Sequence, residues 1–259
     1  MIKLDPETIT LHRQGSGSPL VLLHCLGVDR HFWDIADELL GEFTLVTYDL
    51  PGHGDSAVPK NGYRIEDLSD QLADLLRRHS IARAHIAGIS LGGLIAQCFA
   101  ATNPEMVDRL VLIDTTPRYS DELRAMWAER AASARNAGIG VLIDGLLNIW
   151  FTPASIAENT AAVQYVRSAL QRSPAEGYAL ACEALAAADL RPLAAKITAA
   201  TLVICGDDDI PSFLYSARWL AANIQGAQLE WIAGAKHASV LERPDQALTM
   251  LLKFLAPHR

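Results

Sequence analysis

The strongest structural signal in this chain is AHIAGISLGGL, residues 84–94. Its first half is a short apolar run of strand length, and a helical pattern begins at Leu91. Between them, Gly88, Ser90 and Gly92 have the G-x-S-x-G spacing of a nucleophile elbow, a sharp turn from strand to helix. Small residues two positions to each side of the serine let strand and helix approach closely, so the hydroxyl projects from the turn. The pattern predicts that Ser90 is a nucleophile.

Short apolar runs of strand length recur on both sides of this turn. They are residues 20–23, 44–48, 85–87, 110–113, 202–205 and 229–232. Each run is apolar on both faces, which is typical of parallel strands covered by helices on both sides. Residues 2–4 and 8–13 instead alternate apolar and polar side chains, and they predict an antiparallel hairpin at the start of the chain. We therefore expect a mostly parallel sheet of about eight strands.

Helical patterns fill the gaps between these strands. They span residues 65–79, 91–101, 212–224 and 244–255. Strands that alternate with helices favour a right-handed, doubly wound α/β sheet. The alternation stops between residues 119 and 188, where the patterns are helical throughout. We expect residues 1–117 and 190–259 to form the core, and residues 118–189 to form an inserted helical lid over the carboxyl ends of the strands.

A serine hydroxyl is a weak nucleophile at its ordinary pKa, so Ser90 needs a base. His237 is the preferred candidate among eight histidines, because it follows the last predicted strand, at the same sheet edge as the serine. His24 and His53 also follow strands, but the triads of such serines run serine, acid, histidine along the chain. The remaining histidines are predicted to lie at the surface, in the sheet or at helix ends: His12, His31, His79, His85 and His258.

The imidazole needs a carboxylate to orient it. Three acids compete in GDDD, residues 206–209, which follows a predicted strand. The usual spacing of this turn, G-x-x-D, selects Asp209, and we expect Asp207 and Asp208 to be capping and solvated turn residues. Asp114, at the end of an earlier strand, is the alternative acid.

Two backbone amides are predicted to bind the oxyanion that forms when the serine attacks a carbonyl. Leu91 opens a helix, where unpaired N–H groups and the helix dipole favour negative charge. The second amide belongs to Leu26, in the HCLG loop at residues 24–27 that follows the first long strand. Cys25 is its neighbour and is expected beside the substrate. It is not expected to be the nucleophile, because it does not lie on the elbow.

Composition excludes several other classes of protein. Half of the 259 residues are hydrophobic and 20% are charged, which is incompatible with a disordered chain. A net charge of −8 without a basic patch argues against a nucleic-acid partner. The longest uncharged stretch, residues 84–104, holds polar residues and three glycines, so it does not predict a membrane span.

Cysteine spacing and the N-terminus complete these expectations. The four cysteines are far apart, with no C-x-x-C pair and no Cys/His cluster, so we expect reduced thiols and no metal site. MIKLD at residues 1–5 leads into no apolar run, so we expect no signal peptide and a cytoplasmic protein. No metal or organic cofactor is required by the predicted chemistry.

Together these residues resemble the α/β-hydrolase superfamily over nearly the whole chain, with support from residues 49–56, DLPGHGDS, and from Pro244. Within it, the chain resembles the 3-oxoadipate enol-lactonases. The matching segments lie largely in the predicted lid, at residues 150–153, 173–179 and 189–191, together with Cys182, and in the core at residues 26–29 with Trp33. The resemblance implies a serine hydrolase that acts on a small carboxylic ester or lactone.

The enol-lactone of that family carries a carboxylate, so the resemblance also implies a cation near the crevice. Arg118, where the chain enters the lid, is the predicted clamp, and a solvated arginine is the alternative. Trp127 and Trp150 are predicted either to line the inner wall of the lid or to belong to its core. Residues 23–25, 50–51 and 210–212 depart from the family pattern, and all three segments lie on the predicted rim of the crevice.

Three other functions remain open from the sequence. A broad carboxylesterase and a carbon–carbon bond hydrolase of ring-cleavage products would use the same three side chains. A non-catalytic ligand-binding protein on the same fold would keep the pocket without the reaction. In each case the partner is a small molecule, and neither a nucleic acid nor a membrane is expected.

Overall fold

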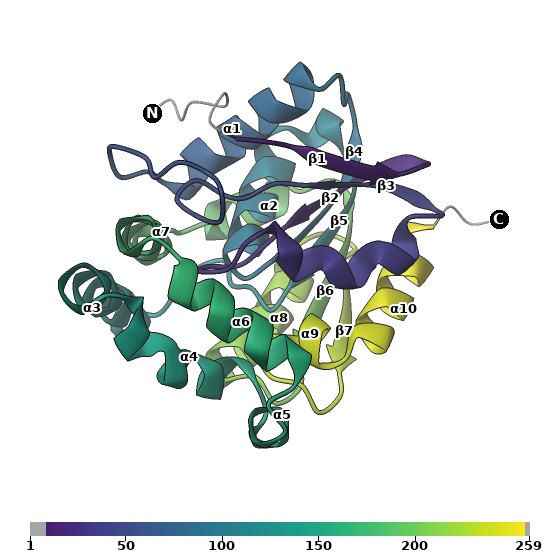
Figure 1. Cartoon of the computed structure of the whole chain (residues 1–259). Helices are drawn as coiled ribbons and strands as arrows, with labels where there is room; N and C mark the ends of the chain where they lie inside the picture. Colours follow the sequence, from purple (N-terminus) through teal and green to yellow (C-terminus); the bar gives the residue numbers. More distant parts are fainter. Residues whose placement is uncertain (1–8, 257–259) are drawn as a thin grey trace.

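The computed structural model describes residues 9–256, and these residues form one seven-stranded sheet with helices on both faces (Figure 1). The strands run in the order β1-β3-β2-β4-β5-β6-β7. Their bounds are β1 His12–Gly15, β2 Ser18–Leu23, β3 Phe43–Thr47, β4 Ala84–Ile89, β5 Val107–Ile113, β6 Ala200–Gly206 and β7 Gln228–Ile232. β1 pairs antiparallel with β3, whereas every other neighbouring pair is parallel. The expected mostly parallel α/β sheet is confirmed.

The predicted opening hairpin falls mostly outside the described residues. Its first strand, residues 2–4, lies there entirely. Within the described part, β1 begins at His12, later than the predicted residue 8, and it pairs with β3. The bounds of this edge strand are set by its pairing with a strand more than 25 residues away. The local alternation of apolar and polar residues carries no information about that partner.

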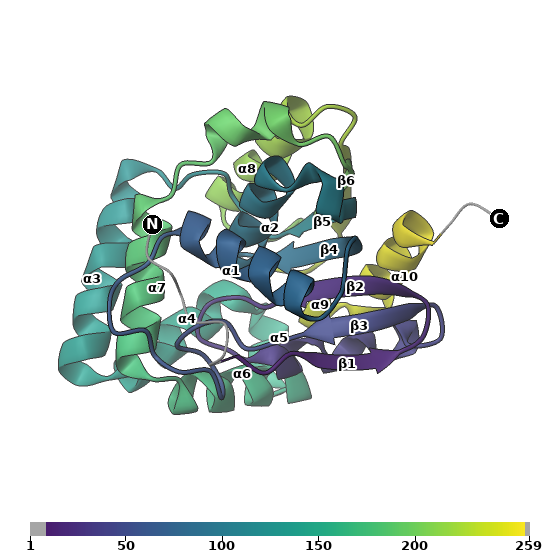
Figure 2. The same ribbon diagram turned by 90° about the horizontal axis from the view of Figure 1, so that it is seen from above.

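The central strands form the core because they are apolar on both faces. All six residues of β4 are buried, as are the last four residues of β2 and of β5. Helices cover both sides, with α1 and α2 on one face and α10 on the other (Figure 2). The core helices are α1 Ile65–Arg78, α2 Leu91–Thr102, α8 Pro211–Asn223, α9 Ser239–Glu242 and α10 Pro244–Leu255, with 3-10 helices at Arg30–Leu39, Pro104–Met106 and Arg191–Lys196. Four of these match the helical patterns of the sequence to within one residue at each end.

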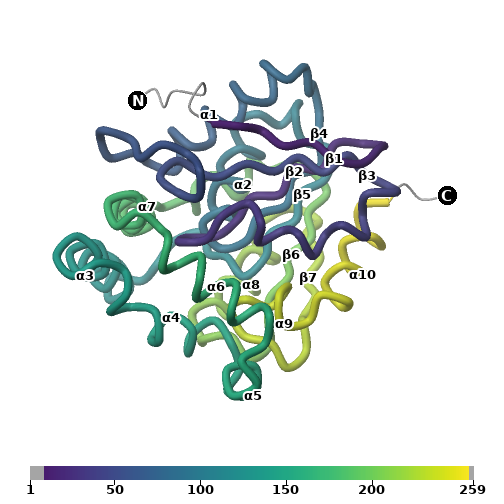
Figure 3. Tube along the Cα trace, viewed as in Figure 1, coloured from purple at the N-terminus to yellow at the C-terminus, as the bar shows by residue number. Residues whose placement is uncertain are grey.

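A helical segment connects β5 to β6, and we call residues 118–189 the lid segment. It contains α3 Asp121–Ala137, a 3-10 turn at Ile139–Leu142, α4 Ile143–Trp150, α5 Pro153–Ala157, α6 Ala161–Arg172 and α7 Ala175–Ala187. These helices gather to one side of the sheet, as the Cα trace shows (Figure 3). At the base of the segment, Arg118 and Asp189 form an isolated antiparallel bridge, and Leu190 N–H donates to the Pro117 carbonyl at 2.8 Å. The two chain crossings therefore lie side by side. The division into core and lid at these residues stays a prediction.

Several direct contacts hold the lid segment against the core. A Cβ on Gly177 would lie 2.1 Å from the Gly52 carbonyl oxygen, so only glycine allows α7 to approach that loop. Ala238 N–H donates to the Trp150 carbonyl at 2.9 Å, which ties the end of α4 to the loop after β7. Within residues 9–256, none of the helices combines the length and the apolar character needed to cross a membrane.

Candidate active site

Ser90 occupies a backbone conformation that the fold must impose. It lies between β4 and α2 with φ +52°, in the left-handed region that side chains rarely adopt. Its N–H donates to the Ile113 carbonyl at 2.9 Å, and Thr115 Oγ1 donates to the Ser90 carbonyl at 2.8 Å. Both partners belong to β5 and the residues that follow it. The neighbouring strand thus holds the strained turn in place.

The two glycines of the elbow have the steric role that the motif requires. A Cβ on Gly88 would lie 2.2 Å from the Gly92 carbonyl oxygen. A Cβ on Gly92 would lie 2.3 Å from the carbonyl oxygen of Leu23 in β2. Because both obstacles are backbone atoms, neither can move aside easily. The close crossing of strand and helix projects the Ser90 side chain out of the turn.

The structure brings together the three side chains predicted from distant parts of the sequence. His237 Nε2 lies 3.1 Å from Ser90 Oγ, and His237 Nδ1 lies 2.9 Å from Asp209 Oδ2. All three residues are buried, with exposed fractions of 6% for Ser90, 4% for Asp209 and 5% for His237. Since a carboxylate only accepts, Nδ1–H donates to Asp209, and Nε2 is left to accept from the serine hydroxyl. This is the hydrogen-bond order of a nucleophile, a base and an orienting acid.

Asp209 and Asp114 lie side by side but have different partners. Besides His237, Asp209 accepts from Ile210 N–H at 2.7 Å. The Asp114 carboxylate accepts from Gly206 N–H at 2.9 Å, and from Ser239 Oγ at 2.6 Å and N–H at 3.3 Å. Asp114 therefore joins the β6 turn to the loop after His237, whereas Asp209 holds the imidazole itself. The geometry favours Asp209 over the alternative acid.

The electrostatic balance around His237 favours its charged form. Burial lowers the pKa of this histidine, but the charge and hydrogen bond of Asp209 raise it more, so the net shift is upward from the ordinary value. At Asp114, burial and then the nearby charge of Asp209 raise the pKa to about 7. A second full negative charge beside Asp209 is thus disfavoured at neutral pH.

One cluster among the described residues has metal-ligand chemistry. Donor atoms of Asp114, Cys205 and Asp209, all buried, lie within 4.8 Å of one another. Their hydrogen-bonding capacity is already used by the protein, because both carboxylates accept from the N–H and O–H donors described above and Cys205 Sγ–H donates to the Gly206 carbonyl at 3.5 Å. These three side chains are therefore arranged to support the His237 imidazole.

The two amides predicted to bind an oxyanion flank the nucleophile. Leu91 is the first residue of α2, and Leu26 lies in the loop after β2. Among the hydrogen bonds of residues 9–256, none uses either N–H group as a donor. The loop turns at Gly27, with φ +78°, where a Cβ would lie 2.7 Å from a methyl group of Leu170 and 3.1 Å from the ring of Tyr178. Side chains of the lid segment thus pack on the oxyanion loop.

Three buried side chains, those of Cys25, His24 and His53, are uncharged, as structural groups usually are. Burial raises the pKa of the Cys25 thiol far above its ordinary range, so it stays protonated. His24 Nε2 accepts from Leu50 N–H at 2.9 Å. Burial lowers the pKa of His24, and it lowers that of His53 to about 3. None of the three has the hydrogen bond to Ser90 that His237 makes.

Aromatic rings of both the core and the lid segment surround the imidazole. The ring of Phe213 lies 4.3 Å from that of His237, and the ring of Trp150 lies 6.1 Å from it. Tyr119 packs edge to face with Phe213 at 6.1 Å and with Trp127 at 5.3 Å. Trp150 therefore contacts the candidate base directly, whereas Trp127 reaches it through two other rings.

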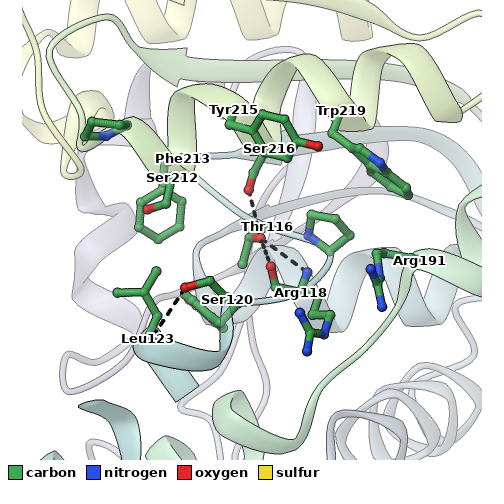
Figure 4. Close-up of a pocket in the computed structure, with 13 residues that line it drawn as sticks. Thr116, Arg118, Ser120, Leu123, Arg191, Ser212, Phe213, Tyr215, Ser216 and Trp219 are labelled. Atoms are coloured by element: carbon green, nitrogen blue, oxygen red, sulfur yellow. Dashed lines mark hydrogen bonds between the residues drawn. The ribbon is translucent and has the colours of Figure 1, made fainter. Parts of the chain in front are cut away.

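Arg118 lies at a cavity beside this site, as Figure 4 shows. The cavity has a volume of about 460 Å³, and Phe213 and Trp219 line it together with Arg118. None of the three triad residues lines it, and the ring of Phe213 lies between the cavity and His237. The Arg118 guanidinium is within 2.5 Å of Asp121 and 3.6 Å of Asp189. Its predicted role as a carboxylate clamp stays a prediction.

Sequence reasoning missed two features of the site. Phe213, against His237, has no motif that announces it. Glu242 Oε1 accepts from Thr152 N–H at 2.9 Å and from Ser155 Oγ at 2.6 Å, and Glu242 Oε2 accepts from Lys236 N–H at 2.8 Å. Glu242 thereby joins the start of α5 to the loop that carries His237. Its lid partners are about 90 residues away in the chain, so no local pattern contains this link.

Comparison with known proteins gives consistent results over most of the chain. Residues 18–244 match the alpha/beta hydrolase fold family. The chain is 31% identical over 233 residues to 3-oxoadipate enol-lactonase 2 of Acinetobacter baylyi, which covers 90% of this chain and 86% of that protein. It is 32% identical over 253 residues to the pimeloyl-(acyl-carrier protein) methyl ester esterase of Chromobacterium violaceum, covering 93% and 95% of the two chains. The crystal structure of the enol-lactonase from Burkholderia xenovorans LB400 superimposes with a TM-score of 0.91 at 34% identity, covering 95% and 96%.

Proposed function

The chain belongs to the alpha/beta hydrolase family, as the resemblance predicted, and we propose that it is a serine hydrolase of small carboxylic esters or lactones, most like a 3-oxoadipate enol-lactonase. The observation that carries the proposal is the continuous hydrogen-bond relay from Ser90 through His237 to Asp209. The similarity to enol-lactonases supports the choice of substrate class.

In the proposed first step, Ser90 Oγ attacks the carbonyl carbon while His237 Nε2 takes its proton. Asp209 keeps the imidazole in the required tautomer and stabilises the imidazolium that forms. The carbonyl oxygen becomes an oxyanion and accepts hydrogen bonds from the amides of Leu26 and Leu91. One such donor typically lowers the barrier by about 2.7–4 kcal/mol.

In the second step, the tetrahedral intermediate collapses and the bond to the ring oxygen breaks. His237 returns its proton to that oxygen, which leaves as an enol and can tautomerise to a ketone. A water molecule, deprotonated by His237, then attacks the carbonyl carbon of the acyl-Ser90 ester. The bond to Ser90 Oγ breaks, His237 returns the proton to that oxygen, and the carboxylic acid is freed. Each proton is carried by the imidazole, so the scheme requires no metal or organic cofactor.

In this scheme, we assign the selection of the substrate to the lid segment. We assign Trp150, whose ring contacts His237, to the wall beside the leaving group. Cys25 adjoins the oxyanion donor and would contact the substrate as a neutral thiol. Trp127 belongs to the same ring cluster at a greater distance from the base.

A panel of substrates tests this function. The purified protein should open an enol-lactone bearing a carboxylate with a kcat/KM well above that for a neutral 4-nitrophenyl ester or for a dienone acid of the ring-cleavage type. Preference for the dienone acid would make carbon–carbon bond hydrolysis the function. Equal, fast turnover of many neutral esters would make the protein a broad carboxylesterase.

The second candidate is an esterase for open-chain esters, which the 32% identity to a methyl ester esterase favours. The relay serves both reactions, and they differ only in whether the leaving oxygen stays tethered to the acyl group. A methyl ester turned over faster than the lactone would support the esterase. Failure of a fluorophosphonate to label Ser90 in the folded protein would instead favour a non-catalytic binding protein.

A further inference from the structure

Tyr119 has a buried hydroxyl at the candidate site that no step of the proposed reaction uses. The residue lies between β5 and α3, at the start of the lid segment, and its exposed fraction is 3%. Among residues 9–256, the hydroxyl has no hydrogen-bond partner at ordinary distance. A buried O–H group without a full hydrogen bond is costly, so its presence at the site needs a physical reason.

Ring packing holds the Tyr119 side chain close to the candidate base. Its ring packs edge to face with the rings of Phe213 and Trp127, at 6.1 and 5.3 Å. Phe213 in turn lies 4.3 Å from the imidazole of His237. Because protein interiors are closely packed, rings on both sides leave the phenol little freedom to turn away. The hydroxyl therefore has a fixed place in the site.

The side chain of Ser90 is the group that this hydroxyl approaches. Burial raises the pKa of Tyr119, whereas hydrogen bonding with the Ser90 side chain and the positive charge of Arg130 lower it. The net shift is upward, so the phenol keeps its proton and remains a donor at neutral pH. Ser90 Oγ lies 3.1 Å from His237 Nε2 and makes its short hydrogen bond there. The phenol is thus beside the reacting oxygen, with its own donor still available.

Strand order decides on which side of the serine the phenol lies. β4, which leads into Ser90, lies between β2 and β5. The loop after β2 carries the predicted oxyanion donor Leu26. Tyr119 instead follows β5, on the side of β6 and β7, whose loops hold the acid and the base. The leaving oxygen of a bound ester must face His237, because it takes its proton from there. The phenol therefore lies on the side of the leaving oxygen, away from the oxyanion loop.

We propose that the Tyr119 hydroxyl donates a hydrogen bond to the leaving oxygen of the substrate and is a further catalytic residue. This role rests on the proposed function, because it belongs to the cleavage of an ester or lactone. Ser90 Oγ bonds to the carbonyl carbon, the bond from that carbon to the leaving oxygen breaks, and its electron pair goes to the leaving oxygen. His237 supplies the proton to this oxygen. Tyr119 keeps its own proton and stabilises the negative charge that develops before the transfer is complete.

A series of leaving groups tests this role. Tyr119→Phe keeps the ring and removes only the hydroxyl. We compare kcat/KM, which reports the acylation step, for the 4-nitrophenyl, 4-chlorophenyl, phenyl and ethyl esters of acetate. The loss should grow as the leaving group becomes less acidic, from about threefold for the 4-nitrophenyl ester to about 100-fold for the ethyl ester, as expected for a donor to developing charge. Equal losses across the series would overturn the proposal, since a structural role does not depend on the leaving group.

Tyr48→Phe is the matched control. Tyr48 follows β3 and has an exposed fraction of 1%, and its hydroxyl also has no hydrogen-bond partner among the described residues. Burial raises the pKa of Tyr48 without any contribution from Ser90. This variant should keep kcat/KM within about twofold of wild type for every ester, because a distant hydroxyl takes no part in the reaction. A loss that grows along the series in Tyr48→Phe as well would overturn the proposal.

A second readout separates this role from the function on which it rests. If the wild type hydrolyses no ester, the proposed function fails, and the rate at which aryl methylphosphonates with the same phenols label Ser90 is measured instead. A steeper dependence on the leaving group in Tyr119→Phe than in wild type would support the role without the function. Parallel dependences, or no labelling of wild-type Ser90, would overturn it. Ester hydrolysis with parallel losses in Tyr119→Phe would remove the role and leave the function.

Discussion

The sheet edge and the lid segment both contribute side chains to the candidate site, but different kinds of interaction hold those side chains in place. At the sheet edge, Ser90, Asp114, Asp209 and His237 are buried, and each has hydrogen-bond partners within the protein. In the lid segment, the contact with the site is ring packing instead: the Trp150 ring lies 6.1 Å from that of His237, and Trp127 reaches it through Tyr119 and Phe213. A hydrogen-bonded network fixes geometry more narrowly than ring packing does. The core therefore holds the candidate triad, and the proposed function assigns the choice of substrate to the lid segment.

Backbone conformation shows the same contrast. Ser90 and Asp114 both have positive φ, and they stand at the carboxyl ends of the adjacent strands β4 and β5. The Asp114 N–H donates to the Ile204 carbonyl at 2.9 Å, so β6 fixes this residue as β5 fixes Ser90. Strain of this kind persists where the surrounding structure determines the conformation. The lid segment also has a non-glycine residue with positive φ, Asn159, but it lies in the turn between α5 and α6, away from the sheet.

The largest effect is expected from removing the reacting groups of the core. Ser90→Ala and His237→Ala should each lower kcat/KM by at least about 10⁴-fold, because the nucleophile or its base is lost. The loss should be equal for the lactone and for neutral esters, because both reactions use the same relay. Steady-state rates of both substrates measure it. Near wild-type activity in either folded variant would contradict the assignment.

The next largest difference in kcat/KM is expected between substitutions of the two core carboxylates. Asp209→Asn removes the acceptor of His237 Nδ1–H and should lower kcat/KM by about 10³- to 10⁴-fold. Asp114→Asn retains an oxygen for Gly206 N–H and should cost no more than about tenfold. Parallel kinetics of the two variants measure the ranking. The reverse ranking would make Asp114 the orienting acid.

A matched pair of glycines probes stability in the two regions. Gly92→Ala places a Cβ 2.3 Å from a backbone oxygen of β2, and it should destabilise the fold by about 3 kcal/mol or more. Gly145→Ala, in α4, meets nothing within 4 Å and should stabilise the protein by about 0.5–1 kcal/mol. Denaturant unfolding measures both. Equal effects would remove the steric argument for the elbow.

The smallest effect is a displacement of the pH profile. His237 accepts a proton only when neutral, and its pKa is raised above the ordinary 6.5, so kcat/KM should fall as the pH drops through a value above 6.5. In Asp209→Asn the raising charge is lost and burial remains, so the acid limb should move to lower pH. Asp114 also raises the pKa of His237, and its own pKa falls when the neighbouring charge of Asp209 is lost, so its carboxylate offsets part of the displacement. An acid limb that stays in place would mean that another group controls it.

The sequence predicted the core because its signals are local. The helix at Pro244–Leu255 begins at a proline and has one apolar face, and the structure has it with the same bounds as the sequence pattern. The elbow needs only five consecutive residues. The histidine and the acid follow strands, and parallel strands bring their carboxyl ends to one edge of a sheet. Position in the alternation therefore brought the candidates to one edge, and the G-x-x-D spacing and the serine–acid–histidine order selected Asp209 and His237 among them.

The sequence predicted that the lid segment is helical. It did not predict the contacts of that segment, because they join residues that are far apart in the chain. Trp150 was predicted either to line the lid or to belong to its core, and its ring contact with His237 depends on the fold. Arg118 was chosen for its place in the chain, whereas its ion pairs with Asp121 and Asp189 depend on the fold. Glu242 has partners that only tertiary structure brings close.

Labelling with a fluorophosphonate, located by peptide mass spectrometry, tests most directly whether the core holds an activated serine. We expect one phosphonyl group per molecule, on the peptide that contains Ser90, in the wild-type protein. The label should be absent from Ser90→Ala and strongly slowed in His237→Ala, while Arg167→Gln, which loses only an exposed ion pair with Asp144, should react like wild type. A folded wild-type protein that stays unlabelled, or that carries the label on another residue, would contradict the account.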